Sequence, residues 1–141
     1  MITPEVSQAI RAHLAAGFAA LPIAWPNEDF ERPVDAATNK VLPFVVVELF
    51  SGGDEQSSIG APGDNLFRSE GRLAMHVYVP RGAGDDVALQ HCKVLRDLFR
   101  GQEIGGIEFR GGQIPPGGDG DDQGLYWRRS VSIDFRFDET G

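Results

Sequence analysis

Near the start of the chain, apolar residues recur every three or four positions, which is typical of one face of an amphipathic helix. They are Val6, Ile10, Leu14 and Phe18, with Ala9 and Leu21 beside them. Thr3 suits the N-cap, Pro4 the first helical position, and Glu5 the positive end of the helix dipole. The pattern predicts a helix from Pro4 to Ala20, broken by Pro22.

A charged segment with two prolines follows, from Ala24 to Lys40. Prolines interrupt helices, so we expect this segment to be extended. Its only large apolar residues are Trp25 and Phe30, and we expect them to pin it to its own domain.

Three later segments have the composition and alternation of β-strands. Phe44–Phe50 is almost continuously apolar, Gly71–Pro80 alternates between apolar and polar positions, and Tyr126–Asp138 alternates most clearly. Between the first two lies Ser51–Glu70, which is rich in Gly, Ser and Asp and is predicted to be a loop. Loops this long are often functional, so we expect this one to contact something outside the chain.

A second helix is predicted to begin at Asp85 and Asp86 and to end near Gly101. The residues expected along its apolar side are Val87, His91, Val94, Leu95 and Leu98, with Phe99 beside them. Ile104–Arg110 is predicted to be a short strand and Gly111–Gly124 a loop. The order of elements favours an α+β fold in which one or two helices cover a mostly antiparallel sheet, in a single domain over residues 1–141.

Composition and charge narrow the functional classes. A net charge of −8 disfavours binding nucleic acid over a broad basic face, although DNA passing through an acidic channel stays compatible with it. A single cysteine excludes an intramolecular disulfide framework and fits a reducing compartment. No apolar run is long enough for a membrane span, and the N-terminus has no signal-peptide pattern. We therefore expect a cytosolic protein.

Short motifs that suggest enzyme chemistry fail on their flanking residues. Gly52–Glu55 is similar to the hairpin of diguanylate cyclases but lacks the aromatic residue and apolar strand that follow it there, so a polar turn is expected. Arg81–Gly84 lacks the lysine of a phosphate-binding loop, and the next residues are acidic.

The remaining candidate ligands are three aspartates and three scattered histidines. Asp119, Asp121 and Asp122 lack the closing glutamate of a calcium loop, and the histidines form no close pair. We expect Cys92 at the core or its boundary, and His13 and His91 to be partly buried with partners. The sequence predicts no catalytic, cofactor or metal site, and no enzyme.

The succession of segments resembles the tail terminator and tail-completion proteins of long-tailed bacteriophages, prophages and gene-transfer agents, from about residue 3 to 138. The matching features are Leu21–Asn27 with Phe30, Phe44–Glu48, Gln56–Gly60, Arg68 with Gly71, Val77–Pro80 before Gly82 and Gly84, Tyr126-Trp127, and Ile133–Phe137.

The resemblance implies a virion protein, assembled in the host cytoplasm, that forms a ring, commonly a hexamer, on the head-proximal end of the tail tube. Its partners would be further copies, the tail-tube protein and a head-completion protein, with DNA only passing through the lumen and no membrane. The residues expected at the subunit interface are Ile59, Leu66, Phe67 and Arg68. Two alternatives stay open: another head–tail adaptor, or a nucleotide- or metal-dependent enzyme. The three apolar residues could also fold back on their own sheet, and Arg68 could be a solvated charge.

Overall fold

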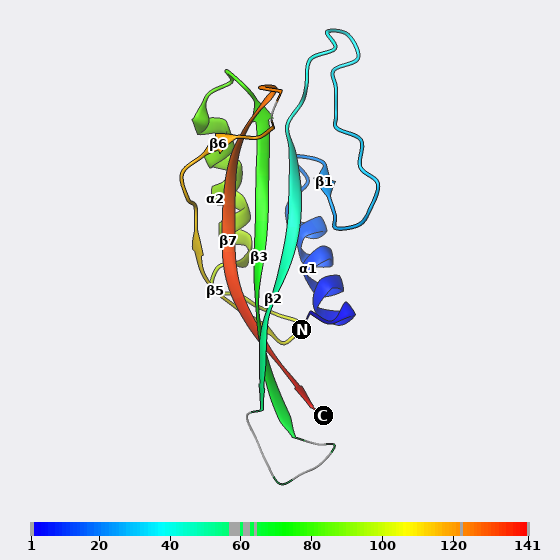
Figure 1. Ribbon diagram of the computed structural model, residues 1–141, viewed down its shortest axis with the longest axis vertical. Coiled ribbons are helices and arrows are strands. Elements are labelled where there is room, and N and C mark those ends of the chain that lie inside the picture. Colours follow the sequence, from blue (N-terminus) through cyan, green and yellow to red (C-terminus); the bar gives the residue numbers. More distant parts are fainter. Residues whose placement is uncertain (1, 57–59, 61–62, 64, 122, 141) are drawn as a thin grey trace.

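Two helices and a sheet make up the described part of the chain (Figure 1). The computed structural model describes residues 2–56, 60, 63, 65–121 and 123–140. The elements are α1 (Pro4–Gly17), β1 (Ile23–Ala24), β2 (Phe44–Gln56), β3 (Leu66–Pro80), α2 (Asp85–Phe99), β4 (Glu103–Ile104), β5 (Ile107–Gln113), β6 (Gly118–Asp119) and β7 (Tyr126–Thr140). This content confirms the predicted α+β class.

The strands form one curled sheet with the order β1-β2-β3-β7-β5-β4, and β6 pairs with β7 off this path. All pairings are antiparallel except that of β1 with β2. β3 and β7 pair without a register shift from Leu66↔Thr140 to Pro80↔Tyr126. The sheet is therefore mostly antiparallel, as predicted, and is organised around the long pair β3–β7.

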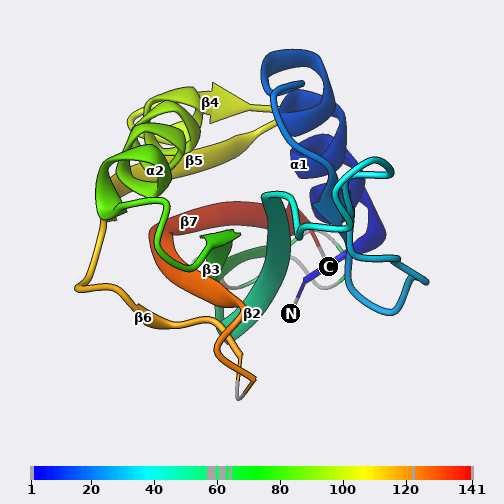
Figure 2. The same cartoon turned by 90° about the horizontal axis from the view of Figure 1, so that it is seen from above.

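Both helices lie on the same side of the central strands (Figure 2). The apolar stripe predicted for α1 is confirmed, because Val6, Ile10, Leu14 and Phe18 are buried. Thr3 caps the helix as expected, and its Oγ1 accepts a hydrogen bond from the N–H of Val6 at 3.3 Å. The helix ends at Gly17 rather than Ala20, since Phe18 already has an extended backbone with φ −138°.

The buried side of α2 differs from the predicted one. The fully buried residues are Ala88, Cys92, Leu95 and Phe99. Val87 and Val94 were expected on the apolar side but are 39% and 50% exposed. Leu95 and Phe99 are buried as expected, whereas Ala88 and Cys92 lie one residue, roughly 100° around the helix, from the expected Val87 and His91. The small side chains of Ala88 and Cys92 allow it to lie close to the sheet, whereas the prediction weighted the larger valines.

The segment between β1 and β2 is held against the sheet by aromatic contacts. The rings of Phe30 and Phe44 have centroids 5.4 Å apart, and Phe44 in turn stacks on Tyr78 at 4.8 Å. Trp25 packs against the core, with the guanidinium of Arg11 4.8 Å from its ring centroid. The prediction that Trp25 and Phe30 pin this segment to the rest of the chain is confirmed.

The loop predicted over Ser51–Glu70 is wrong for most of its length. β2 continues through Gln56 and β3 begins at Leu66, with the register Ser51↔Gly71 and Gln56↔Phe67. The sequence pattern misses this hairpin because its residues are polar and small. Backbone pairing to neighbouring strands, which leaves no mark on side-chain periodicity, supplies the missing stabilisation.

Two smaller predictions also need correction. The strand expected at Ile104–Arg110 is a hairpin of β4 and β5, turning at Gly105 and Gly106 with φ of 58° and 82°. Positive φ at both central residues is what a tight hairpin turn requires. The loop expected at Gly111–Gly124 is shorter, because β5 runs to Gln113 and β6 occupies Gly118–Asp119.

Candidate subunit interface

The three longest strands extend beyond the two helices as a projecting arm (Figure 1). We define the arm as residues 51–56 of β2, 66–71 of β3 and 135–140 of β7. β3 lies in its middle and pairs with both outer strands. The arm begins at a register shift in β2 between Ser51 and Asp54, a bulge that bends the strand and increases its twist.

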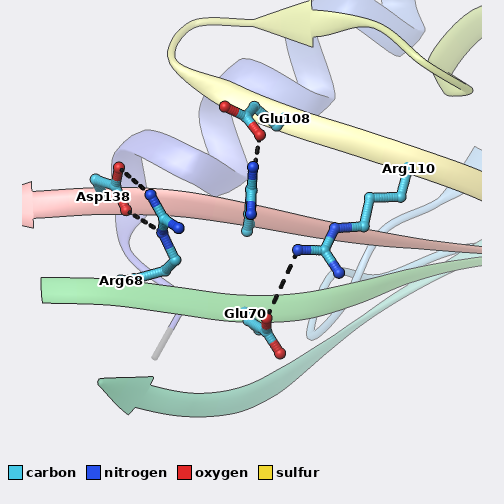
Figure 3. Close-up of polar contacts among 6 residues, drawn as sticks. Arg68, Glu70, Glu108, Arg110 and Asp138 are labelled. Atoms are coloured by element: carbon cyan, nitrogen blue, oxygen red, sulfur yellow. Dashed lines mark hydrogen bonds and ion pairs between the residues drawn. The ribbon is translucent and has the colours of Figure 1, made fainter. Parts of the chain in front are cut away.

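The two faces of the arm differ in chemistry. Ser69 is buried with 1% of its surface exposed, and its partner Phe137 on β7 is also buried. Side chains alternate across a strand, so the residues next to Ser69 on β3 and next to Phe137 on β7 project from the opposite face. That opposite face carries Arg68, Glu70 and, on β7, Asp138 (Figure 3). One face of the arm thus continues the core and the other is charged.

The charged face consists of arginines paired with carboxylates on neighbouring strands. Arg68 binds Asp138 through two hydrogen bonds, Nε–Oδ1 at 2.9 Å and Nη2–Oδ2 at 3.3 Å. The other three pairs are Arg72–Asp134 at 3.0 Å, Arg136–Glu108 at 2.6 Å and Arg110–Glu70 at 3.8 Å. Positive and negative groups are equal in number in these pairs, so this face of the arm is polar without strong net charge.

The Arg68–Asp138 pair affects the protonation of the carboxylate. The hydrogen bonds from Arg68 are the main cause that lowers the pKa of Asp138, and the charges of Arg68 and Arg136 act in the same direction. Asp138 is therefore a stable anion near neutral pH. The side chains are 40% and 38% exposed, so water screens the pair and its net contribution is modest.

A cavity of about 440 Å³ opens on the charged face at the root of the arm. Its walls combine the ring of Phe50, which is 47% exposed, with the paired Arg72 and Asp134. Arg110 and Glu70 close it on other sides. The combination of two apolar rings, Phe50 and Phe135, with charged groups resembles the composition of protein–protein contacts more than that of an enclosed ligand site.

The structure places the predicted interface residues as follows. Leu66, Phe67 and Arg68 lie consecutively at the start of β3, all partly buried, in the arm. Alternation puts Leu66 on the charged face and Phe67 on the other. Arg68 has an acidic partner within its own chain, Asp138. Ile59 lies outside the described residues.

A polar cluster that sequence reasoning missed lies further along the same face of the sheet. His76 Nδ1 is 2.6 Å from Ser130 Oγ, and its Nε2 is 2.9 Å from Glu48 Oε1. The residues come from three adjacent strands, and the register places His76 opposite Ser130. Because the three residues are far apart in the sequence, no motif indicated that they meet. The alternation of each strand did assign His76 and Ser130 to the wetter face of the sheet. Three polar groups in a row on one face of the sheet act as a cross-strand network.

The other candidates from the sequence have structural partners. His13 Nε2 is 2.9 Å from the carbonyl oxygen of Leu98, and His91 meets the ring of Phe18 edge-on, so both histidines are partly buried with partners as expected. Burial lowers the pKa of His91. Cys92 is fully buried, as the core assignment predicts.

The acidic motifs also serve local structure. Asp121 accepts hydrogen bonds from the N–H groups of Leu125 and Tyr126 at 2.9 and 3.3 Å, and Asp119 pairs with Arg81. Asp122 lies outside the described residues. Gly52–Glu55 lies within β2, so the expected polar turn there is wrong. Among the described residues, no three His, Cys, Asp or Glu side chains are grouped to hold a metal ion, and no helix is long and apolar enough to span a membrane.

Comparison with known proteins gives a family and a fold. No curated protein matches the sequence. Several solved structures are similar, and one of them has a TM-score of 0.61 and 23% sequence identity over 93% of this chain and 94% of the other. That identity shows a shared fold alone. The family described as phage tail terminator protein matches residues 5–135, nearly the whole chain, and the resemblance drawn from the sequence is thereby confirmed. The chain belongs to the phage tail terminator protein family, whose role in the phage tail is structural.

Proposed function

We propose that this protein forms a ring, most simply a hexamer, on the head-proximal end of the phage tail tube. The ring ends polymerisation of the tube and offers a surface to a head-completion protein. Binding relies on shape and electrostatic complementarity, without bond chemistry. Family membership over residues 5–135 is the observation that carries this proposal. Assembly takes place in the host cytoplasm, and DNA passes only through the lumen.

The arm supports the proposal because a closed ring needs two different contact surfaces on each subunit. Its two faces differ, one continuing the core and the other carrying arginine–carboxylate pairs. In this proposal, Leu66 and Phe67 lose their remaining exposure when a neighbouring subunit packs against the arm. Arg68 and Asp138 keep their pairing within the chain and fix the shape of the surface.

Light scattering and negative-stain electron microscopy test the proposal on the purified protein, alone and mixed with the tail-tube protein. We expect rings under at least one condition, and tubes capped at one end. A protein that stays monomeric and binds neither tube nor head-completion protein contradicts it. Binding to the head-completion protein without binding to the tube indicates a head–tail adaptor instead.

A pair of variants locates the contact. Phe67→Ser changes a partly buried residue of the arm, whereas Val94→Ser makes a comparable change on the exposed side of α2. We expect Phe67→Ser to lose ring formation with little change in circular dichroism, and Val94→Ser to form rings like the wild type. Equal ring formation by both variants contradicts the assignment of the arm to the interface.

A further inference from the structure

We propose that neighbouring copies join by strand addition: the outer edge of β2 in one copy pairs with the open edge at the end of β7 in the next. This inference rests on the proposed ring and specifies its contact. The bond type is main-chain hydrogen bonding between sheet edges, and the partner is a second copy of this chain.

The first open edge belongs to β2. The short β1 covers it only at Val45 and Val46, and in the described residues no strand pairs with this edge further along. The N–H of Val45 points outward, because it donates to the carbonyl oxygen of Pro22 at 2.9 Å. N–H directions alternate along a strand, so those of Leu49 and Ser51 also point outward. In the part of the chain that the structure describes, a row of main-chain donors and acceptors without a neighbouring strand therefore begins just past β1.

The space beside this edge is only partly filled. A cavity of about 290 Å³ lies along it, with Trp25 and Pro26 on one side and residues 46–49 of β2 on the other. Trp25 follows directly after the last residue of β1, and a turn begins there, with the N–H of Glu28 donating to the carbonyl oxygen of Trp25 at 3.3 Å. The chain thus leaves the sheet at this point and uncovers β2.

The second open edge belongs to β7. Its pairing with β5 ends at Glu108↔Arg136, whereas its pairing with β3 continues to Thr140. Among the described residues, 137–140 therefore have a strand on one side only. A cavity of about 370 Å³ lies beside them, bounded by the start of α1 and by the turn at Gly105 and Gly106.

Strand direction makes these two edges compatible. β2 and β7 are both antiparallel to β3, so they run in the same direction. Rotation about an axis inclined to the strands, as in a closed barrel, keeps that direction and staggers the register between copies, so β2 of one copy meets β7 of the next as a parallel pair. The two edges differ, so the contact is heterologous and closes by rotation. Closure also removes edges that would otherwise promote uncontrolled aggregation.

A proline substitution tests the β2 edge. In Ser51→Pro, the lost N–H points outward and takes no part in the β2–β3 pairing, and the side chain is exposed. Ser51→Ala keeps the N–H and is the matched control. We expect Ser51→Pro to remain folded by circular dichroism but to lose the ring, and Ser51→Ala to keep it. A folded Ser51→Pro variant that forms rings as well as Ser51→Ala overturns the inference.

Disulfide cross-linking in the assembled ring tests both edges together. Ser51→Cys with Glu139→Cys places two thiols on the same sheet face, since Ser51 pairs with Gly71 and Glu139 with Phe67. Phe50→Cys with Glu139→Cys places them on opposite faces, since Phe50 pairs with Arg72, and is the control. The native Cys92 is fully buried and contributes no cross-link.

We expect oxidation with copper phenanthroline to give covalent oligomers up to ring size for the same-face pair only. Rings without this cross-link overturn strand addition and leave the proposed function standing. Cross-links in the single variants indicate an isologous contact of one edge with itself, which also overturns the inference. A protein that never forms rings overturns the proposed function and this inference with it.

Discussion

Gly71 lies against the ring of Phe135, so that a Cβ on Gly71 would be 2.6 Å from Cζ of that ring and 2.9 Å from the carbonyl oxygen of Phe50. The two residues are direct cross-strand partners at the root of the arm. The aromatic ring occupies the space that a side chain would take, and strands β2, β3 and β7 approach closely there.

This contact predicts the effect of Gly71→Ala. The added methyl group must displace a buried ring, so we expect a loss of about 1–3 kcal/mol in the free energy of unfolding. Urea denaturation measures it. Gly111→Ala is the control, because a Cβ there would meet nothing within 4 Å. Equal stability of the two variants would show that Phe135 moves aside freely.

The Arg68–Asp138 pair predicts a pH-dependent contribution to stability. The pKa of Asp138 is lowered in the folded state, so its stabilising effect is present above the unfolded pKa of about 3.9 and is lost as pH falls through the folded pKa. For Asp138→Asn we expect a loss of about 0.2–1 kcal/mol at pH 7. The difference from wild type should vanish in strong acid. A difference that is constant with pH contradicts this assignment.

The observed orientation of α2 predicts a contrast between two neighbouring residues. Leu95 is fully buried and Val94 is 50% exposed. Leu95→Ala removes core packing and leaves a cavity, so we expect it to cost about 2–5 kcal/mol. Val94→Ala should stay within about 0.5 kcal/mol of wild type. Thermal or urea unfolding of both variants checks this, and a loss for Val94→Ala as large as that for Leu95→Ala would support the apolar side predicted from sequence, which included both residues.

Cys92 should resist thiol reagents in the folded protein. Burial is the main cause that raises the pKa of its thiol to about 11, so at pH 8 only about one molecule in a thousand carries the reactive thiolate. Labelling with a chromogenic disulfide should be slow in native buffer and fast in denaturant. Rapid native labelling would show that α2 opens readily from the sheet.

The sequence predicts elements correctly where one side chain in two, or one in three to four, is large and apolar. The stripe of α1 and the alternation of Tyr126–Asp138 are the best examples, and both appear as expected. The predicted apolar side of α2 is right for Leu95 and Phe99 but wrong for Val87 and Val94, because packing depends on how near a helix can approach the sheet. Ala88 and Cys92 are buried for their small size, which hydrophobic periodicity underweights.

The same limit applies to the segment proposed for the subunit interface. The segment around Leu66 to Arg68 stood out because it lay in a stretch without periodicity, but its structure was misjudged as a loop. Pairing with β7 is a long-range property: Arg68 meets Asp138 only because strands distant in the chain become neighbours. The hairpin at Gly105-Gly106 differs, because it does have a local sequence signal: two adjacent glycines favour a tight turn.

The uninterrupted pairing of β3 with β7 has a mechanical consequence. Each strand has 15 residues, and the ladder spans the whole length of both. A residue in a strand rises about 3.3 Å, so the pair is a rod of about 50 Å. When the two strands are pulled apart along their axis, all the hydrogen bonds between them are loaded in shear at once. Such a subunit transmits tension from one end to the other without unzipping bond by bond.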